Sequence, residues 1–250
     1  IVGFGLQDVA EKTIFEYENI KGEALAVPVS NINPYLVDAP DLVLEKRNQP
    51  ICIVPTISYG SMANDDGHLL LDKEQRNALI AAEPATAPYI RRYMGAQEFL
   101  NNAERWCLWL KDISPSLMRS SNELRHRIEA VRKFRASSNR EATRNLAATP
   151  SLFGEDRQPL KSYLLLPKVS SENRPYMPIG FMPSEVIANG SALTISDSGH
   201  YEMGVLQSKM HMAWMRAVAG RMKSDYQYSA QIVYNNFPWP DIPEKLEPNQ

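Results

Sequence analysis

Five adjacent polar side chains lie between an apolar stretch and Pro175. They are Ser170, Ser171, Glu172, Asn173 and Arg174. Of all segments of this chain, this one is best suited to form hydrogen bonds with the edge of a nucleic-acid base. Arg can bridge two acceptors of guanine, Asn can pair with adenine, and Glu can accept from the cytosine amine. A loop that braces a sheet through hydrogen bonds and ion pairs uses the same residue types. The segment therefore indicates either base readout or a structural brace.

The distribution of charge along the chain favours contact with a polyanion. Residues 1–100 contain 8 Lys or Arg against 14 Asp or Glu, residues 101–174 contain 14 against 8, and residues 175–250 contain 5 against 7. The three parts therefore carry net charges of −6, +6 and −2, although the whole chain is slightly acidic at −2. A basic block between acidic flanks creates a field on one side that suits nucleic acid. A helix whose charged side chains only contact water would give the same numbers of charged residues, so it is the alternative interpretation.

A long amphipathic helix is expected to carry most of the basic block, from about Ser116 to Ser137. The pair Ser114-Pro115 is typical of a helix start, and Leu124, Ile128 and Val131 recur at the spacing of one apolar stripe. Cations that fall largely off this stripe, with two more on a short continuation, are predicted to contact phosphates. They are Arg125, Arg132, Lys133, Arg135, Arg140 and Arg144.

A second long helix is expected from Tyr201 to Met222, and the segment after it combines one cation, hydroxyl groups and two aromatic rings. Lys223, Tyr226 and Tyr228 in this segment suit contacts to phosphate and sugar. Pairs of Tyr residues are also common packing residues, so a role in the core is the alternative interpretation.

The tripeptide Asn33-Pro34-Tyr35 is close to the catalytic loop of amino-group DNA methyltransferases, which reads Asn-Pro-Pro-Tyr. In that loop the Asn accepts hydrogen bonds from the target amine and the aromatic ring stacks on a flipped base. Here one proline is missing, and the Gly3-x-Gly5 pair has no helix behind it that could form a cofactor loop. The tripeptide therefore predicts a turn, with an autonomous methyltransferase as the alternative hypothesis.

Other reactive residues show no pattern typical of a metal or nucleophile site. The histidines are His68, His126, His200 and His211, without ligand spacing, and the chain has no Gly-x-Ser-x-Gly turn. Cys52 and Cys107 form no disulfide framework, which favours a reducing cytosol. No stretch approaches the roughly 20 apolar residues of a membrane span. We therefore predict a cytoplasmic protein with no metal and no membrane partner.

The expected fold is α+β and loop-rich, with irregular mixed or antiparallel sheets and two long helices. The chain is 44% hydrophobic and 22% charged, and its 18 prolines outnumber its 12 glycines, which is typical of a globular protein with many irregular segments. A shorter helix is expected from Asp72 to Ala82. Strands are expected at residues 1–6, 12–17, 25–29, 51–57, 68–71, 89–94, 105–110, 163–169, 177–181 and 192–195.

Five blocks of the sequence, taken together and in order, resemble the C-terminal part of MmeI-like adenine-specific DNA methyltransferases. The blocks are Asn31–Asp38, Arg105–Leu110, Val131–Arg135, Val169–Arg174 and Tyr234–Pro240. These enzymes are single-chain restriction-modification proteins that use S-adenosylmethionine. In the family the target-recognition domain follows the methyltransferase domain. The cofactor loop and the Asn-Pro-Pro-Tyr loop lie upstream of the part that this chain resembles.

The resemblance implies a DNA target-recognition domain over residues 31–233. Residues 1–30 are expected to be the last strand and sheet edge of an upstream methyltransferase domain, and residues 234–250 the start of a C-terminal tail. The start at Ile1, without an initiator Met, predicts a fragment of a longer protein. The expected partners are double-stranded DNA and the upstream domain. We expect no cofactor and no catalytic residue in the fragment, and S-adenosylmethionine in the parent enzyme. A protein-interaction module that docks an acidic partner is the second alternative.

Overall fold

The computed structural model describes residues 9–19 and 21–241, and the chain divides into two compact units. They are Ile1–Arg47 and Asn48–Gln250, so the division falls after Arg47, whereas the sequence predicted a boundary after Ser30. The strand expected at residues 1–6 lies outside the described residues.

The smaller unit contains one antiparallel pair, β1 (Lys12–Glu16) and β2 (Leu25–Val29), which confirms both strands predicted there. Thr13 faces Pro28 across the pair. Several large apolar side chains of this unit are exposed, among them Phe15 at 59% and Leu25 at 65%. The pair therefore buries little of its own apolar surface.

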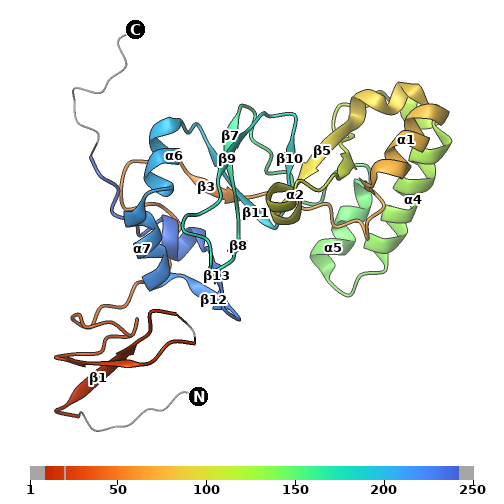
Figure 1. Ribbon diagram of the computed structural model, residues 1–250. Coiled ribbons are helices and arrows are strands. Elements are labelled where there is room, and N and C mark those ends of the chain that lie inside the picture. The colour runs from red at the N-terminus through yellow and green to blue at the C-terminus, as the bar shows by residue number, and fades with distance from the viewer. Residues whose placement is uncertain (1–8, 20, 242–250) are drawn as a thin grey trace. The chain divides into compact units, whose positions relative to one another are not determined.

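The larger unit contains two main hydrophobic cores, and we call the regions around them the helical lobe (residues 60–158 and 187–188) and the sheet lobe (residues 48–59, 159–186 and 189–241). In Figure 1 the helical lobe lies on the right and the sheet lobe on the left. A third, smaller cluster that includes Met94, Leu165 and Ala192 draws on both lobes. The two lobes thus share buried contacts within one unit.

A four-stranded sheet of order β10-β5-β6-β4 forms one layer of the helical lobe. Its strands are β4 (Leu70–Leu71), β5 (Ile90–Met94), β6 (Trp106–Leu108) and β10 (Ile187–Ala188). The expected strands 89–94 and 105–110 are confirmed, the second in a shorter form. Between them come α1 (Lys73–Ala82), η1 (Pro84–Tyr89) and α2 (Ala96–Asn101). Helix α1 is the predicted short helix, and its start is a capping box between Asp72 and Gln75.

The predicted long basic helix is divided in two, α3 (Pro115–Ser120) and α4 (Asn122–Ala136). Ser121 is extended and its hydroxyl accepts from Leu124 N, so this residue caps a new helix and does not continue the old one. Glu83 strengthens this start, because its carboxylate accepts from the backbone N–H of Asn122 at 3.1 Å and of Glu123 at 3.2 Å.

The apolar stripe of α4 lies in the core as predicted, with Leu124, Ile128 and Val131 buried. The chain then turns into α5 (Glu141–Asn145) and η2 (Leu146–Ala148). Both pack against α4.

Two sheets and three helices make up the sheet lobe. One sheet, of order β3-β11-β7-β9, is antiparallel throughout, and the other has the order β12-β13-β8. The first consists of β3 (Ile57–Tyr59), β7 (Tyr163–Pro167), β9 (Gly180–Met182) and β11 (Ala192–Ser196). The second consists of β8 (Val169–Ser170), β12 (Gly220–Met222) and β13 (Asp225–Gln227). The helices are α6 (His200–Leu206), α7 (Lys209–Val218) and the π-helix η3 (Ala230–Tyr234).

Two predictions in this lobe were wrong in extent. The second long helix ends at Leu206, restarts under the Ser208 cap, and gives way to strand β12 where helix was expected. The strand expected at residues 51–57 reduces to β3, and Ile51 and Ile53 are exposed. The α+β class with small, mostly antiparallel sheets is confirmed. Within the described residues, no helix is long and apolar enough to cross a membrane.

Candidate nucleic-acid interface

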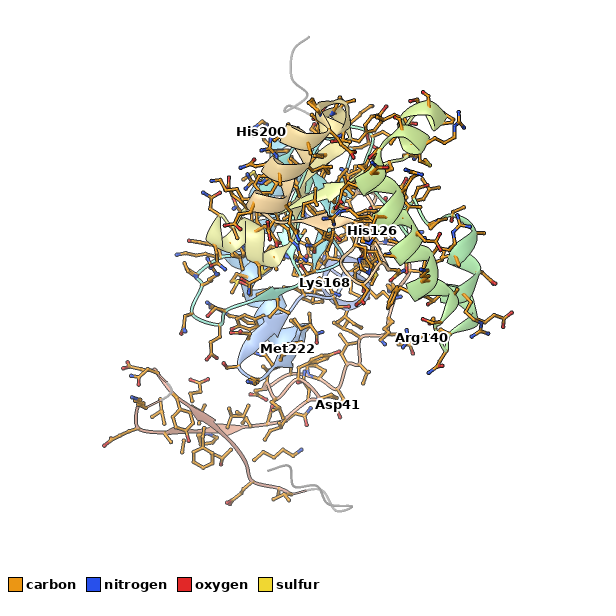
Figure 2. All side chains as sticks on the ribbon, turned by 90° about the vertical axis from the view of Figure 1, so that its right-hand side faces the viewer. Asp41, His126, Arg140, Lys168, His200 and Met222 are labelled. Atoms are coloured by element: carbon orange, nitrogen blue, oxygen red, sulfur yellow. The ribbon has the colours of Figure 1, made fainter. Side chains whose placement is uncertain are left out.

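Five of the six cations predicted to contact phosphates lie exposed on α4, on α5 and at the connection between them. They are Arg125, Arg132, Lys133, Arg140 and Arg144. Figure 2 labels Arg140, which precedes α5. Arg132 forms an ion pair with Glu129 at 3.5 Å, in which both side chains are 54% exposed. Such surface pairs stabilise a fold by at most about 1 kcal/mol, so a phosphate can replace the carboxylate at little cost.

The sixth cation, Arg135, is fully buried, and the prediction that it contacts phosphate was wrong. Its guanidinium group donates to five backbone carbonyls at 2.7 to 2.9 Å. The acceptors belong to Ala63, Asn64, Leu146, Thr149 and Leu152. A guanidinium group has five N–H donors, so none remains for a ligand. Burial lowers the pKa of Arg135, and the nearby charge of Asp65 opposes that shift.

The position of Arg135 follows from the apolar stripe of α4. Residue 135 lies four positions after Val131, so it continues the buried face of the helix. The neighbouring Arg132 and Lys133 fall on the exposed face. Helical periodicity could therefore have identified Arg135 as a structural residue.

The segment from Ser170 to Arg174 leaves β8 as a turn. Ser170 is buried, Arg174 N donates to Ser171 O at 3.1 Å, and Asn173 N donates to Ser171 Oγ at 3.3 Å. Asn173 is exposed, and Glu172 and Arg174 are half-buried. Within the described part of the chain, the side chains of these three residues make no hydrogen bond or ion pair. Their polar atoms therefore remain available to a ligand.

The segment after the second helix forms the hairpin of β12 and β13, with Lys223 exposed in its turn at a φ of 58°. Tyr226 and Tyr228 were predicted to contact sugar and phosphate, but both are buried. Arg221 covers the ring of Tyr226, with Cζ 3.8 Å from the ring centroid. Both tyrosines therefore pack in the core, as the alternative interpretation of this segment predicted.

Tyr228 lies against His211 of α7, with its hydroxyl 3.0 Å from His211 Nε2. Burial lowers the pKa of His211 to about 4, so its imidazole is neutral at pH 7. The ring of Phe237 meets His211 edge to face at 4.5 Å between centroids. This buried cluster supports the sheet that carries the hairpin.

Two predicted segments come together in the β12-β13-β8 sheet. Ser170 pairs with Tyr226 and Val169 with Gln227 in antiparallel register, so the chain leaves β8 at the end of the sheet where the hairpin turn lies. Lys223 and the segment that follows Ser170 therefore share one sheet end. The exposed Arg221 belongs to the same hairpin and was missed, because its segment was assigned to a helix. The alternation of Tyr226 and Tyr228 was the available strand signal.

The hairpin and the basic helices occupy the same edge of the larger unit. In Figure 1, α5 and β12 both lie along its lower edge. Figure 2, turned by 90° about the vertical axis, places the labels Arg140 and Met222 at this same level. Arg140 and the hairpin that adjoins the open segment of the sheet lobe thus lie at the same level of the larger unit.

Asn33 lies in a tight turn, in agreement with the turn interpretation. Its Oδ1 accepts from Tyr35 N at 2.9 Å and from Val37 N at 3.3 Å. Tyr35 Oη accepts from Leu44 N at 2.7 Å. The side-chain oxygen that a target amine would need is therefore occupied by the backbone. Among residues 9–19 and 21–241, no three His, Cys, Asp or Glu side chains are grouped so as to hold a metal ion.

The fold, its exposed cations and its open polar turn together define the class of this protein as a loop-rich α+β recognition domain. The chain matches the family of the MmeI target recognition domain over residues 38–241. It belongs to this family, which confirms the resemblance found in the sequence.

One curated relative and one solved structure show how much of a longer protein the chain represents. DNA methyltransferase A of Bacillus subtilis (strain 168) is 37% identical over 243 residues, which cover 97% of this chain and 27% of that protein. The type IIL restriction-modification enzyme MmeI, solved in complex with DNA, is 45% identical with a TM-score of 0.90. That match covers 96% of this chain and 32% of the MmeI chain. The chain thus spans about a third or less of either relative.

Proposed function

We propose that this chain binds duplex DNA and recognises a specific sequence for an adenine-specific methyltransferase of a restriction-modification system. One observation carries the proposal: the exposed Arg140 of the basic segment lies level with the hairpin, and the hairpin turn shares a sheet end with the open base-compatible side chains after Ser170. The names of the two relatives, a DNA methyltransferase and a restriction-modification enzyme in complex with DNA, support it.

In this proposal the helical lobe contacts phosphates and the sheet lobe contacts base edges. Cations of α4 and α5 hold phosphates, which gives affinity without sequence information. In the sheet lobe, Glu172, Asn173 and Arg174 contact base edges, with Lys223 on an adjacent phosphate. Because these three side chains have no partner within the described residues, base contacts would not disrupt existing bonds.

The smaller unit belongs, in this proposal, to an upstream methyltransferase domain of the same protein. An isolated two-stranded hairpin is marginal in water, so β1 and β2 need a neighbour. The exposed Phe15 and Leu25 provide apolar surface for such a contact. The upstream domain is therefore the second partner of this chain, besides DNA.

The proposed parent enzyme uses S-adenosylmethionine and acts in the cytoplasm, where its DNA substrate lies. The described loop around Asn33 does not fit a methyl-transfer site, because its amide oxygen already accepts two backbone N–H groups. No chemical step is therefore assigned to this chain. Cys52 and Cys107 are free thiols, which is compatible with a reducing compartment.

The test is a salt titration of the binding of this chain to duplex DNA. The logarithm of the binding constant is expected to fall linearly with the logarithm of salt concentration, by about 0.9 for each neutralised phosphate. Replacing Lys133 and Arg140 together by Ala is expected to reduce the slope by about 1.8 on the same basis. A double replacement of Lys161 and Lys209, two exposed cations of the sheet lobe, is the matched control.

The outcomes separate the proposal from its alternatives. A chain that binds an acidic protein but no duplex would favour the interaction-module hypothesis. Submicromolar S-adenosylmethionine binding by this chain alone would favour the autonomous methyltransferase. Equal slopes for the double variant and its control would remove α4 and α5 from the interface.

A further inference from the structure

Tyr59, the last residue of β3, is an exposed aromatic residue with a cation on its ring from each of two other segments. Its side chain is 40% exposed. Lys168 Nζ lies 4.9 Å from the ring centroid, and Arg157 Cζ lies 6.0 Å from it. An aromatic face attracts a cation within about 6 Å, so the ring holds both positive groups close to the surface.

The register of the β3-β11-β7-β9 sheet explains how Tyr59 and Lys168 meet. Leu193 of β11 pairs with Tyr59 on one side and with Leu166 of β7 on the other, so these three side chains lie on one face. Lys168 is two positions beyond Leu166, and its N donates to Ser191 O at 3.1 Å. The period of two places its side chain on the face that carries Tyr59.

The backbone beneath this cluster is fixed. Gly60 N donates to Ala192 O at 3.1 Å, and Ser61 N donates to Ala188 O at 2.7 Å. A Cβ on Gly60 would lie 2.2 Å from Asn189 O, so only glycine allows the two chain segments to approach this closely. Tyr59 therefore ends a strand that continues into a closely packed, hydrogen-bonded segment.

Arg157 is tied to the same segment. Its N donates to Ser61 Oγ at 3.0 Å, and its guanidinium group donates to Gly60 O at 3.5 Å and pairs with Glu155. The Arg157 and Glu155 side chains are 36% and 38% exposed, so this ion pair is open to water. A competing anion can take the place of the carboxylate.

Lys168 has no carboxylate partner in the part of the chain that the structure describes. Among the residues that the structure describes, its Nζ donates to Gly190 O alone, at 3.4 Å. The next residue, Val169, begins β8, which leads directly to the segment Ser170–Arg174. An ammonium group without a carboxylate partner among the described residues thus stands four residues before Glu172, the first of the side chains proposed to contact bases. Figure 2 labels Lys168 above the level of Arg140 and Met222.

We propose that Tyr59, Arg157 and Lys168 form a phosphate-binding site for the DNA backbone next to the base-reading segment. This site rests on the proposed function and adds to it residues that the sequence pattern did not indicate. Lys168 neutralises one phosphate, and Arg157 exchanges Glu155 for the next. The Tyr59 ring keeps both cations in place before DNA arrives, which reduces the entropy lost on binding. The site fixes the register of the duplex over Glu172 to Arg174, because phosphate contacts position a protein and base contacts specify the sequence.

The test compares Lys168→Ala with Lys161→Ala in the salt titration of duplex binding by this chain. Both lysines flank β7, at opposite ends, and Lys161 is 83% exposed beside Asp197. Loss of one phosphate contact makes the slope shallower by about 0.9 for Lys168→Ala, whereas Lys161→Ala keeps the wild-type slope. Tyr59→Phe keeps the ring and is expected to bind as wild type. Tyr59→Leu removes the ring and is expected to weaken binding, while thermal melts show whether each variant remains folded.

The results separate this inference from the proposed function. If wild type binds duplex DNA with a salt slope, but Lys168→Ala and Lys161→Ala have equal slopes, the site is refuted and the proposed function stands. If wild type shows no salt-dependent duplex binding, both are refuted. A lower slope for Lys168→Ala, together with weaker binding by Tyr59→Leu but not by Tyr59→Phe, supports the site as described.

Discussion

The helical lobe and the sheet lobe offer polar side chains to solvent in different ways. Helix α4 exposes Arg132 and Lys133 on one face and buries Arg135 on the other. Within one turn, a guanidinium group is therefore available to a ligand at position 132 and fixes the fold at position 135. In the sheet lobe, strand alternation and pairing bury Tyr226 and Tyr228 while the neighbouring turns remain open. The difference shows that residue type alone does not identify a binding residue. The face of the element decides, and each element has its own period.

The largest effect that would separate the two faces of α4 is expected from Arg135→Ala. The change removes a buried side chain and leaves five carbonyls, most of them partly buried, without their donor, and we expect a loss of unfolding free energy of about 3 to 5 kcal/mol. Arg132→Ala, one turn earlier on the exposed face, should change stability by at most about 0.5 kcal/mol. Urea unfolding of both variants measures this. An Arg135→Ala chain as stable as wild type, with a shallower salt slope, would mean that this guanidinium group faces DNA.

A second comparison uses pH to weaken the sheet lobe alone. The folded protein keeps His211 neutral, with a pKa of about 4, while the unfolded chain has an ordinary value near 6.5. Between these values only the unfolded chain binds the extra proton, so stability falls as pH drops below about 6.5, by up to about 3 kcal/mol near pH 4. Above pH 6.5 this contribution is complete.

Urea unfolding at pH 7.5 and pH 5 tests the assignment to His211. The His211→Phe chain should lose this part of the pH dependence, whereas His126→Gln, a change at an exposed histidine of α4, should keep it. The same pH dependence in wild type and His211→Phe would show that another group is responsible.

A third comparison asks whether Arg174 and Glu172 read bases or brace the loop. A bidentate contact discriminates bases by about 1 to 3 kcal/mol, so Arg174→Ala in the parent enzyme should relax one position of the recognised site. Non-specific affinity should remain near that of wild type, because a base contact adds little to it. Sequencing of the methylated sites and a thermal melt of the same protein decide the question. An unchanged site with a lower melting temperature would assign Arg174 to the brace.

The smallest expected effect concerns the carboxylate that starts α4. Glu83→Gln keeps the shape but removes the charge that faces the N-terminus of the helix, and we expect a loss of about 1 kcal/mol. Glu185→Gln, at an exposed position of the sheet lobe, is the control and should melt as wild type. If the two variants melt together, Glu83 does not hold the basic helix in place.

The sequence predicted much of this arrangement where local signals agree with tertiary packing. The stripe of Leu124, Ile128 and Val131 located α4, and the acidic start at Asp72 located α1. It failed where local signals conflict with long-range pairing. Residues 220–222 continue an apolar helix by pattern but pair with β13, and β13 requires β8, which lies more than 50 positions earlier. Sequence-local reasoning has no access to that pairing.

The sequence predicted the surface position of the basic block more reliably than the partners of individual side chains. The basic block is present on the surface, because solvation keeps charged side chains outside unless they find partners. Arg135 is the exception, since its carbonyl partners come from two segments that no pattern connects to α4. The cluster of Tyr59 and Lys168 was missed for the same reason. Its members come from β3 and from the end of β7, which meet only through β11.

The partners of Arg135 also bear on the order in which a growing chain can assemble. Two of its acceptors, Ala63 and Asn64, precede it, and the other three end at Leu152. The bonds of this residue can therefore close during synthesis, before β7 and the rest of the sheet lobe have left the ribosome. The β12-β13-β8 sheet has to wait for residues 225–227. A ribosome that pauses once the chain to Leu152 has left its exit tunnel would thus present α4 and α5 already packed around Arg135, before the base-reading segment has emerged.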